Sequence, residues 1–376
     1  MPEPELRLGT RVIGRSHPTY FIADISANHD GDLARAKRLI ELAKDAGADA
    51  AKFQNFQAPE IVSRHGFESL GIQRGHQARW KKSVYQVYQE ASIPWAWTPV
   101  LKAHCDAVGI DYFSTPYDFG AVDMLDPYVE VYKIGSGDIT WPEMLRAVAR
   151  KGKPVILACG ASEIADVQRA VSVIRAINPQ LALLQCNTNY TGNIENLRDI
   201  NLHVLRTFQT MFPDLVTGLS DHTAGPSTVL GAVALGARII EKHFTDDHAR
   251  EGPDHPFSMT PATWRQMVDL TRELELALGQ PIKHITPNER ETVIVQRRCV
   301  RAAAALPAGT ILTRTMLTVL RPSPPGAVQP YEIEDVIGKQ LTVPLAEGEY
   351  VRWTVLAEPA ARRLPHQAPQ AVGLAS

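Results

Sequence analysis

The sequence lacks the features that mark several large classes of protein. It has 39 Lys and Arg against 41 Asp and Glu and a formal net charge of -2, so it has no basic excess for binding nucleic acid. It contains no apolar run near the ~20 residues that span a bilayer, and its first residues, MPEPELRLGTRV, show no basic segment followed by an apolar core. We therefore expect a cytoplasmic protein that acts on a small molecule, without a nucleic-acid or membrane partner.

Cysteine is also scarce. Cys105, Cys159, Cys186 and Cys299 show no CxxC spacing, which predicts reduced, mostly buried thiols rather than a disulfide or zinc framework. Hydrophobic side chains, by contrast, make up 44% of the 376 residues, which is enough to bury a full core.

A strand–helix cycle runs through most of the chain. Strands are predicted at 19–26, 48–55, 111–116, 131–137, 154–160, 181–187, 215–222 and 237–244, each followed by a helix candidate. Strands separated by helices pair in parallel, and eight such units over roughly 250 residues predict an α/β fold, the (β/α)8 TIM barrel. The alternative is an open doubly wound sheet, but the segment ISANHDGD after the first strand is not its GxGxxG turn.

A second, smaller unit follows the barrel. Short strands in CVRAAA, MLTVLR and QLTVPL alternate with the turns LPAGT, RPSPPGA and LAEGEY, which is typical of a small β-rich domain. We predict a barrel domain at 1–281, a linker at 282–296, the β-rich domain at 297–357 and a disordered Ala/Pro-rich tail at 358–376.

Polar side chains end many of the predicted strands. Alternate strand residues face the same side, which places the following sets together: Asp24 with Ser26, Lys52 with Gln54, Thr115 with Phe113, Lys133 with Val131 and Gly135, His222 with Ser220 and Gly218, and His243 with Glu241 and Ile239. A TIM-barrel interior is normally filled by Val, Ile and Leu. Because a buried charge costs several kcal/mol unless it is paired or bound, these strand ends predict a ligand site at the C-terminal mouth of the barrel.

Two consecutive strands end in histidine. Neighbouring parallel strands lie ~4.8 Å apart, so the imidazoles of His222 and His243 can converge on one metal ion, with Asp221, Glu241 and Asp246 as supporting carboxylates. Catalytic zinc needs three protein ligands; two histidines better suit Mn²⁺, or else Mg²⁺, that keeps water or substrate oxygens as further ligands. The alternative is that each histidine hydrogen-bonds a nearby carboxylate.

Two lysines end two other strands. Lys52 and Lys133, with the hydroxyls of Thr115 and Ser136 and the Gly-rich turn GSGD, predict a pocket for a phosphate or a carboxylate. Lysines in surface ion pairs are the alternative, and strand parity argues against it.

Several ordered segments resemble one family. IADISANHDGDLARAKRLIELAKDAGADAAKFQNF, YFSTPYD, YKIGSGDIT, GKPVILACGA, GLSDHTAG, IIEKHFTDD and EGPDHPFSM are similar to the sialic acid (nonulosonic acid) synthases, and residues 297–356 resemble their antifreeze-like SAF domain. The resemblance implies a C–C bond-forming transferase that condenses phosphoenolpyruvate with an N-acetylated aldose, such as N-acetylmannosamine, and releases phosphate. It also implies a domain-swapped homodimer.

The resemblance also implies roles for individual residues. It makes His222 and His243 the Mn²⁺ ligands, and Lys52 and Lys133 part of the phosphoenolpyruvate pocket. The remaining substrate-binding residues are Thr115 and Ser136 in the same pocket, Tyr190 and Asp254 at the acceptor sugar, Arg321 from the SAF domain, Thr188 where the family commonly has Asn or Ser, and Ser220 on the strand of His222.

Departures from the family pattern keep other interpretations open. Asp24 and Asp138 stand where the family usually has Glu, and they complete the predicted catalytic set with Lys52 and Lys133; Asp138 is the candidate general base. Ala158 replaces a serine, and the insert at 74–100 has no close family equivalent. A related phosphoenolpyruvate-dependent 3-deoxy-ulosonate synthase that uses another aldose or an aldose phosphate is one alternative. A catalytically silent barrel that binds sugar is the other.

Overall fold

The chain folds into two units. The computed structural model describes residues 3–70, 77–78 and 80–359, and the units divide after Gly279. Most of the predicted disordered tail, from residue 360 on, and residues 74–76 and 79 of the insert lie outside the described residues. Within those ranges no helix is both long and apolar enough to cross a membrane.

An eight-stranded parallel sheet forms the centre of the first unit. Its strands are β3 (Tyr20–Asp24), β4 (Ala50–Asn55), β5 (Asp111–Pro116), β6 (Tyr132–Ile134), β7 (Val155–Ala158), β8 (Leu181–Cys186), β9 (Val216–Asp221) and β10 (Ile239–His243). They pair in the order β5-β4-β3-β10-β9-β8-β7-β6, and β5 and β6 lie next to each other. Because the first strand, β3, pairs with the last, β10, the sheet curls into a barrel, and the open doubly wound alternative is wrong.

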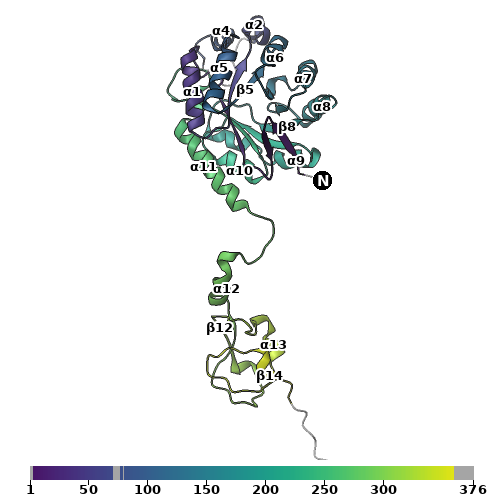
Figure 1. Ribbon diagram of the computed structural model, residues 1–376, viewed down its shortest axis with the longest axis vertical. Coiled ribbons are helices and arrows are strands. Elements are labelled where there is room, and N and C mark those ends of the chain that lie inside the picture. The colour runs from purple at the N-terminus through teal and green to yellow at the C-terminus, as the bar shows by residue number, and fades with distance from the viewer. Residues whose placement is uncertain (1–2, 71–76, 79, 360–376) are drawn as a thin grey trace, which may run out of the picture. The chain divides into compact units, whose positions relative to one another are not determined.

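Helices surround the strands (Figure 1). One follows each strand, in the order α1 (Leu33–Asp45), α5 (Trp97–Val108), α6 (Phe119–Leu125), α7 (Pro142–Ala149), α8 (Ile164–Arg175), α9 (Val204–Met211), α10 (Ser227–Ala234) and α11 (Pro261–Leu278). Three short helices, α2 (Ala58–Ile61), α3 (Arg64–Ser69) and α4 (Val84–Ala91), are added between β4 and α5. The Asp32 side chain caps α1 by accepting from the backbone N–H groups of Ala34 and Arg35.

Strand parity separates two apolar layers. One lies between the strands and the helices. The other fills the barrel interior and includes Tyr20, Ile22, Ala50, Phe113, Val131, Ile156, Ala158, Ala182, Leu184, Cys186, Val216 and Ile239. Along the strands that end in a polar residue of the predicted site, these residues lie an even number of positions before that residue, so both face the barrel interior, as predicted. The interior is therefore apolar along the strands and polar at their C-terminal ends.

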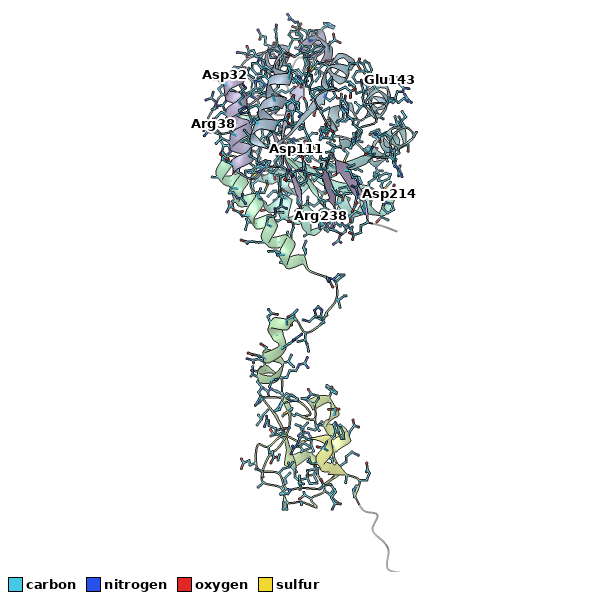
Figure 2. The ribbon with its side chains drawn as sticks, in the orientation of Figure 1. Asp32, Arg38, Asp111, Glu143, Asp214 and Arg238 are labelled. Carbon is cyan, nitrogen blue, oxygen red and sulfur yellow. The ribbon has the colours of Figure 1, made fainter. Side chains whose placement is uncertain are left out.

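An N-terminal hairpin extends the interior layer, a feature that the sequence analysis did not predict. Strands β1 (Glu5–Leu8) and β2 (Arg11–Gly14) pair antiparallel, and Leu6, Leu8 and Ile13 pack with the barrel interior. In Figure 2, Asp32, Arg38 and Glu143 lie on the periphery of this unit, whereas Asp111 lies over the strands. There the Asp111 carboxylate accepts a hydrogen bond from the Tyr20 hydroxyl at 2.5 Å.

The second unit is small and has its own core. Its elements are α12 (Arg290–Gln296), β11 (Cys299–Ala302), β12 (Leu317–Leu320), α13 (Ile333–Val336), β13 (Gln340–Leu341) and β14 (Leu356–Ala357). β11 pairs with β12 and β13 with β14, both antiparallel. Eleven buried aliphatic residues, among them Val300, Leu312, Val328 and Val351, form the core.

Gly218 allows β9 and β10 to pack closely, so we predict that Gly218→Ala destabilises the fold. A Cβ at this position would lie 2.3 Å from the carbonyl oxygen of Ile239 and 2.4 Å from Cδ2 of Leu184. We expect a loss of about 1–3 kcal/mol in the free energy of unfolding, measured by urea titration. Gly137→Ala is the matched control, because a Cβ there meets nothing within 4 Å; equal losses in both variants would contradict the prediction.

Candidate active site

A buried ion pair joins β3 and β4 at the C-terminal rim of the barrel. The Nζ of Lys52 lies 2.6 Å from Oδ2 of Asp24, which also accepts from Nε2 of Gln54 at 3.2 Å. Lys52 and Asp24 are each only 2% exposed. Burial alone would lower the pKa of Lys52, but the carboxylates of Asp24 and Glu241 outweigh it and raise this pKa. Lys52 is therefore a buried cation that faces the barrel interior.

A second lysine faces the same interior from β6. The Nζ of Lys133 lies 3.4 Å from Oε1 of Glu241 and donates to the carbonyl oxygen of Ile134 at 3.1 Å. The Ser220 hydroxyl donates to Glu241 Oε1 at 3.1 Å. Lys133 is 2% exposed, so neither lysine lies at the protein surface.

Hydroxyl groups lie beside the lysine strands. Oγ1 of Thr115 is buried and makes no hydrogen bond. The Ser136 hydroxyl accepts from the backbone N–H of Gly160 at 2.9 Å. A Cβ on Gly160 would lie 2.5 Å from Cγ2 of Thr188 and 3.0 Å from Oγ of Ser136. Glycine is therefore needed where these two loops meet, and Thr188 lies beside Ser136.

The two rim histidines lie next to each other, with ring centroids 5.4 Å apart. The Nδ1 of His222 is 2.8 Å from the carbonyl oxygen of Asn187. Burial and the neighbouring His243 lower the pKa of His222 to about 3. A neutral ring that donates from Nδ1 keeps a lone pair on Nε2, which is the tautomer of a metal ligand.

His243 lies between two carboxylates without bonding to either. Its Nε2 is 3.7 Å from Oδ2 of Asp24, and its Nδ1 is 3.8 Å from Oδ2 of Asp254 and makes no hydrogen bond although it is buried. The two rings thus offer nitrogen atoms that the protein leaves uncommitted, which fits a metal ion. Among the described residues, no group of three or more His, Cys, Asp and Glu side chains could hold one, so further ligands would come from substrate or water.

An aromatic wall borders the histidines. The Tyr190 ring is 4.2 Å from that of His222, and the Phe257 ring is 4.9 Å from that of His243, centroid to centroid. Next to this wall, Asp254 accepts from the hydroxyl of Ser26 at 2.5 Å. The two residues predicted to contact the acceptor, Tyr190 and Asp254, therefore both lie beside the predicted metal ligands.

Asp138 lies in the single 3-10 turn Ser136–Asp138 after β6. Burial raises its pKa to about 6, and the positive charge of Lys133 opposes part of that shift. Its Oδ2 is buried without a hydrogen bond. A carboxylate with a pKa near neutrality can gain and lose a proton under physiological conditions.

Two predicted residues of the barrel, Asp221 and Asp246, lie apart from this cluster. The carboxylate of Asp221 binds Lys242, Thr223 and Thr228. Asp246 pairs with Arg35, at 2.6 and 2.9 Å. Arg321 belongs to the second unit, where it is exposed.

Two tyrosines were missed by the sequence analysis. Burial raises the pKa of Tyr117, and Asp138 and Tyr190 raise this pKa further. The Tyr117 hydroxyl lies close to Gly135 of the GSGD turn, 3.1 Å from the position that a Cβ there would occupy. Burial likewise raises the pKa of Tyr88, with a contribution from Asp254. Tyr117 directly follows a predicted strand in STPYD, so its position could have been noticed. Tyr88 lies within the insert at 74–100, which has no close family equivalent, and no sequence pattern there marked it as a site residue.

Comparison with known proteins identifies the family. The chain matches the NeuB family over residues 39–283 and the SAF domain over residues 297–357. It belongs to the NeuB family. It is 34% identical to N-acetylneuraminate-9-phosphate synthase of Homo sapiens, over 91% of this chain and 93% of the relative. It is 32% identical to N,N'-diacetyllegionaminic acid synthase of Campylobacter jejuni, over 89% of this chain and 99% of the relative.

A solved structure agrees with this assignment. The N-acetylneuraminic acid synthetase of Leptospira borgpetersenii, crystallised with citrate, superposes with a TM-score of 0.68 at 32% identity, covering 77% of this chain and 95% of that one. The TIM barrel followed by a SAF domain, predicted from the sequence, is thus confirmed for this NeuB-family chain.

The raised pKa of Asp138 predicts a pH-dependent gain in stability for Asp138→Asn. The pKa of this carboxyl is 3.8 in the unfolded chain and about 6 in the folded chain. Between pH 3.8 and about pH 6, the native state therefore binds more protons than the unfolded state does. Folding stability therefore falls as pH rises through this window. We expect the variant to be more stable than wild type at pH 8, with the gain gone by pH 4, in urea titrations. Glu195→Gln removes an exposed carboxylate; the same pH-dependent gain there would contradict this cause.

Proposed function

We propose that this protein condenses phosphoenolpyruvate with an N-acetylated aldose similar to N-acetylmannosamine, giving a nonulosonic acid and phosphate. It would thus be a cytoplasmic transferase that forms a C–C bond. The main support is the rim itself, where two buried lysines and two neighbouring histidines face one interior. The named relatives are synthases of sialic-type acids, which supports the same general reaction here.

The lysine side of the rim suits phosphoenolpyruvate. This donor carries a phosphate and a carboxylate, and the two ammonium groups of Lys52 and Lys133 match those charges. Thr115 has a free buried hydroxyl, and Ser136 and Ser220 add two more at the same rim. Ala158 places a methyl group in the interior where the family resemblance expects a serine, so this chain would bind the donor with one hydroxyl fewer.

The histidine side suits a divalent metal. His222 and His243 would hold Mn²⁺, or else Mg²⁺, through the ring nitrogens that make no hydrogen bond to the protein. When bound, the ion would supply Lewis-acid polarisation of the acceptor's carbonyl group. Tyr190 and Asp254, beside the two rings, would orient the acceptor sugar.

Asp138 would act as the general base. The methylene carbon of phosphoenolpyruvate forms a bond to the aldehyde carbon of the acceptor, whose oxygen takes a proton from solvent and becomes a hydroxyl. The neighbouring carbon, which bears the phosphate, is left with positive charge; water adds to it, and Asp138 accepts the water's proton. Phosphate then leaves by C–O cleavage. A positioned base contributes roughly 10²- to 10⁴-fold, and the pKa of about 6 leaves Asp138 ionised at neutral pH.

The experiment that tests this function is phosphate release from phosphoenolpyruvate in the presence of Mn²⁺ and a panel of N-acetylated hexosamines. We expect release that depends on both the acceptor and the metal, with a nonulosonic acid as the second product. Absence of phosphate release with every sugar of the panel would favour a barrel that only binds sugar.

The metal proposal predicts that His222→Ala and His243→Ala each abolish metal-dependent turnover and weaken Mn²⁺ binding in calorimetric titrations. Each variant should still unfold cooperatively, at a midpoint lowered by the loss of a buried ring. His203→Ala, which removes an exposed histidine, should leave Mn²⁺ binding unchanged. Full Mn²⁺ affinity in either rim variant would show that the ligands are wrongly assigned.

We also propose a domain-swapped homodimer in which the partner subunit's Arg321 reaches the acceptor sugar. Arg321→Ala should then raise the KM for the acceptor at least about tenfold, in line with the loss of a charged hydrogen bond, and leave the KM for phosphoenolpyruvate unchanged. Arg297→Ala removes another exposed arginine of the same unit and serves as control. An unchanged acceptor KM in Arg321→Ala would exclude this role.

A further inference from the structure

A cavity of about 990 Å³ opens beside the aromatic wall of the rim. Tyr190 and Phe257, whose rings contact the two rim histidines, form one side of it. The other sides come from residues 80–91, which include α4, and from the 250–256 loop after β10. Helix α4 lies beside α2 (Figure 1) and also contacts α3. The cavity thus continues outward from the predicted metal ligands, where the far end of an acceptor sugar would lie.

Three cations line this cavity, and a carboxylate that also lines it neutralises each one. Lys81 lies 2.8 Å from Glu251, and Arg250 lies 2.6 Å from Asp30. Lys82 lies 2.7 Å from both carboxylate oxygens of Glu90. The described lining residues therefore carry three positive and three negative charges. A phosphate dianion that approached these cations would also approach their carboxylates, and like charges repel.

The remaining lining is largely apolar. It includes the side chains of Trp80, Val87, Ala91, Pro253, Pro256 and Phe257, with Tyr190 and Thr191 as the polar members. Such a surface suits a methyl group, whether that of an acetamido substituent or that of a deoxy carbon. These apolar side chains offer no opposite charge to a phosphate group.

We propose that this cavity is an acceptor subsite that selects an uncharged amino sugar with an apolar substituent over an aldose phosphate, and that Glu90 and Glu251 determine this specificity. The inference rests on the proposed function and extends it to the class of acceptor. The two glutamates act by neutralising Lys82 and Lys81. Without the glutamates, the lysines would be free to bind a phosphate group.

The experiment compares kcat/KM for N-acetylmannosamine with kcat/KM for its 6-phosphate in the full-length protein. We expect the wild type to prefer the unphosphorylated sugar at least about tenfold, and the double variant E90Q/E251Q to shift this ratio at least about tenfold toward the phosphate. The matched control is Asp106→Asn, which breaks the exposed Lys102–Asp106 pair on α5, a pair that does not line the cavity.

The outcomes separate this inference from the proposed function. If neither sugar supports phosphate release, the proposed function fails for these acceptors, and the specificity inference fails with it. Turnover that favours the 6-phosphate in wild type would overturn the inference while the proposed function stands. A ratio that E90Q/E251Q leaves unchanged, or that Asp106→Asn shifts equally, would overturn the assignment to the two glutamates.

Discussion

The site depends on charge buried at the end of an otherwise apolar barrel. Lys52 with Asp24, and Lys133 with Glu241, are ion pairs in which every partner is at most 5% exposed. Removing four charges from water costs several kcal/mol per ion, and pairing recovers only part of it. The pairs are also incompletely bonded, because Oδ1 of Asp24 and Oε2 of Glu241 lack hydrogen bonds. An arrangement this costly is expected where a polar ligand completes it.

The rest of the barrel makes this arrangement possible. The interior below the rim is continuous apolar packing, which the N-terminal hairpin extends with Leu6, Leu8 and Ile13. Burial of such side chains stabilises the fold by roughly 1.5–3 kcal/mol each, and this offsets the cost of the charged rim. Gly218 contributes by letting β9 lie close against Ile239 of β10, the strand that carries Glu241 and His243.

Much of this could be predicted from the sequence because β-strands alternate with a period of two. That period, together with parallel pairing, was enough to place Lys52, Lys133, His222 and His243 on one interior. The same parity would also have shown that Asp221, adjacent to His222, points the other way, toward Lys242. Long-range features, such as the pairing of Asp246 with Arg35 of α1 and the burial that raises the pKa of Tyr88 on α4, follow from no local pattern and needed the structure.

The register of three neighbouring strands explains how the two halves of the site meet. Asp24 on β3 is directly opposite Lys52 on β4 and His243 on β10. Its Oδ2 therefore lies 2.6 Å from the ammonium group of Lys52 and 3.7 Å from the imidazole of His243. An aspartate reaches both neighbours from this position, and its other oxygen stays free. Asp24 thus links Lys52 and His243 electrostatically, and a change in its charge would alter the electrostatic potential at both side chains.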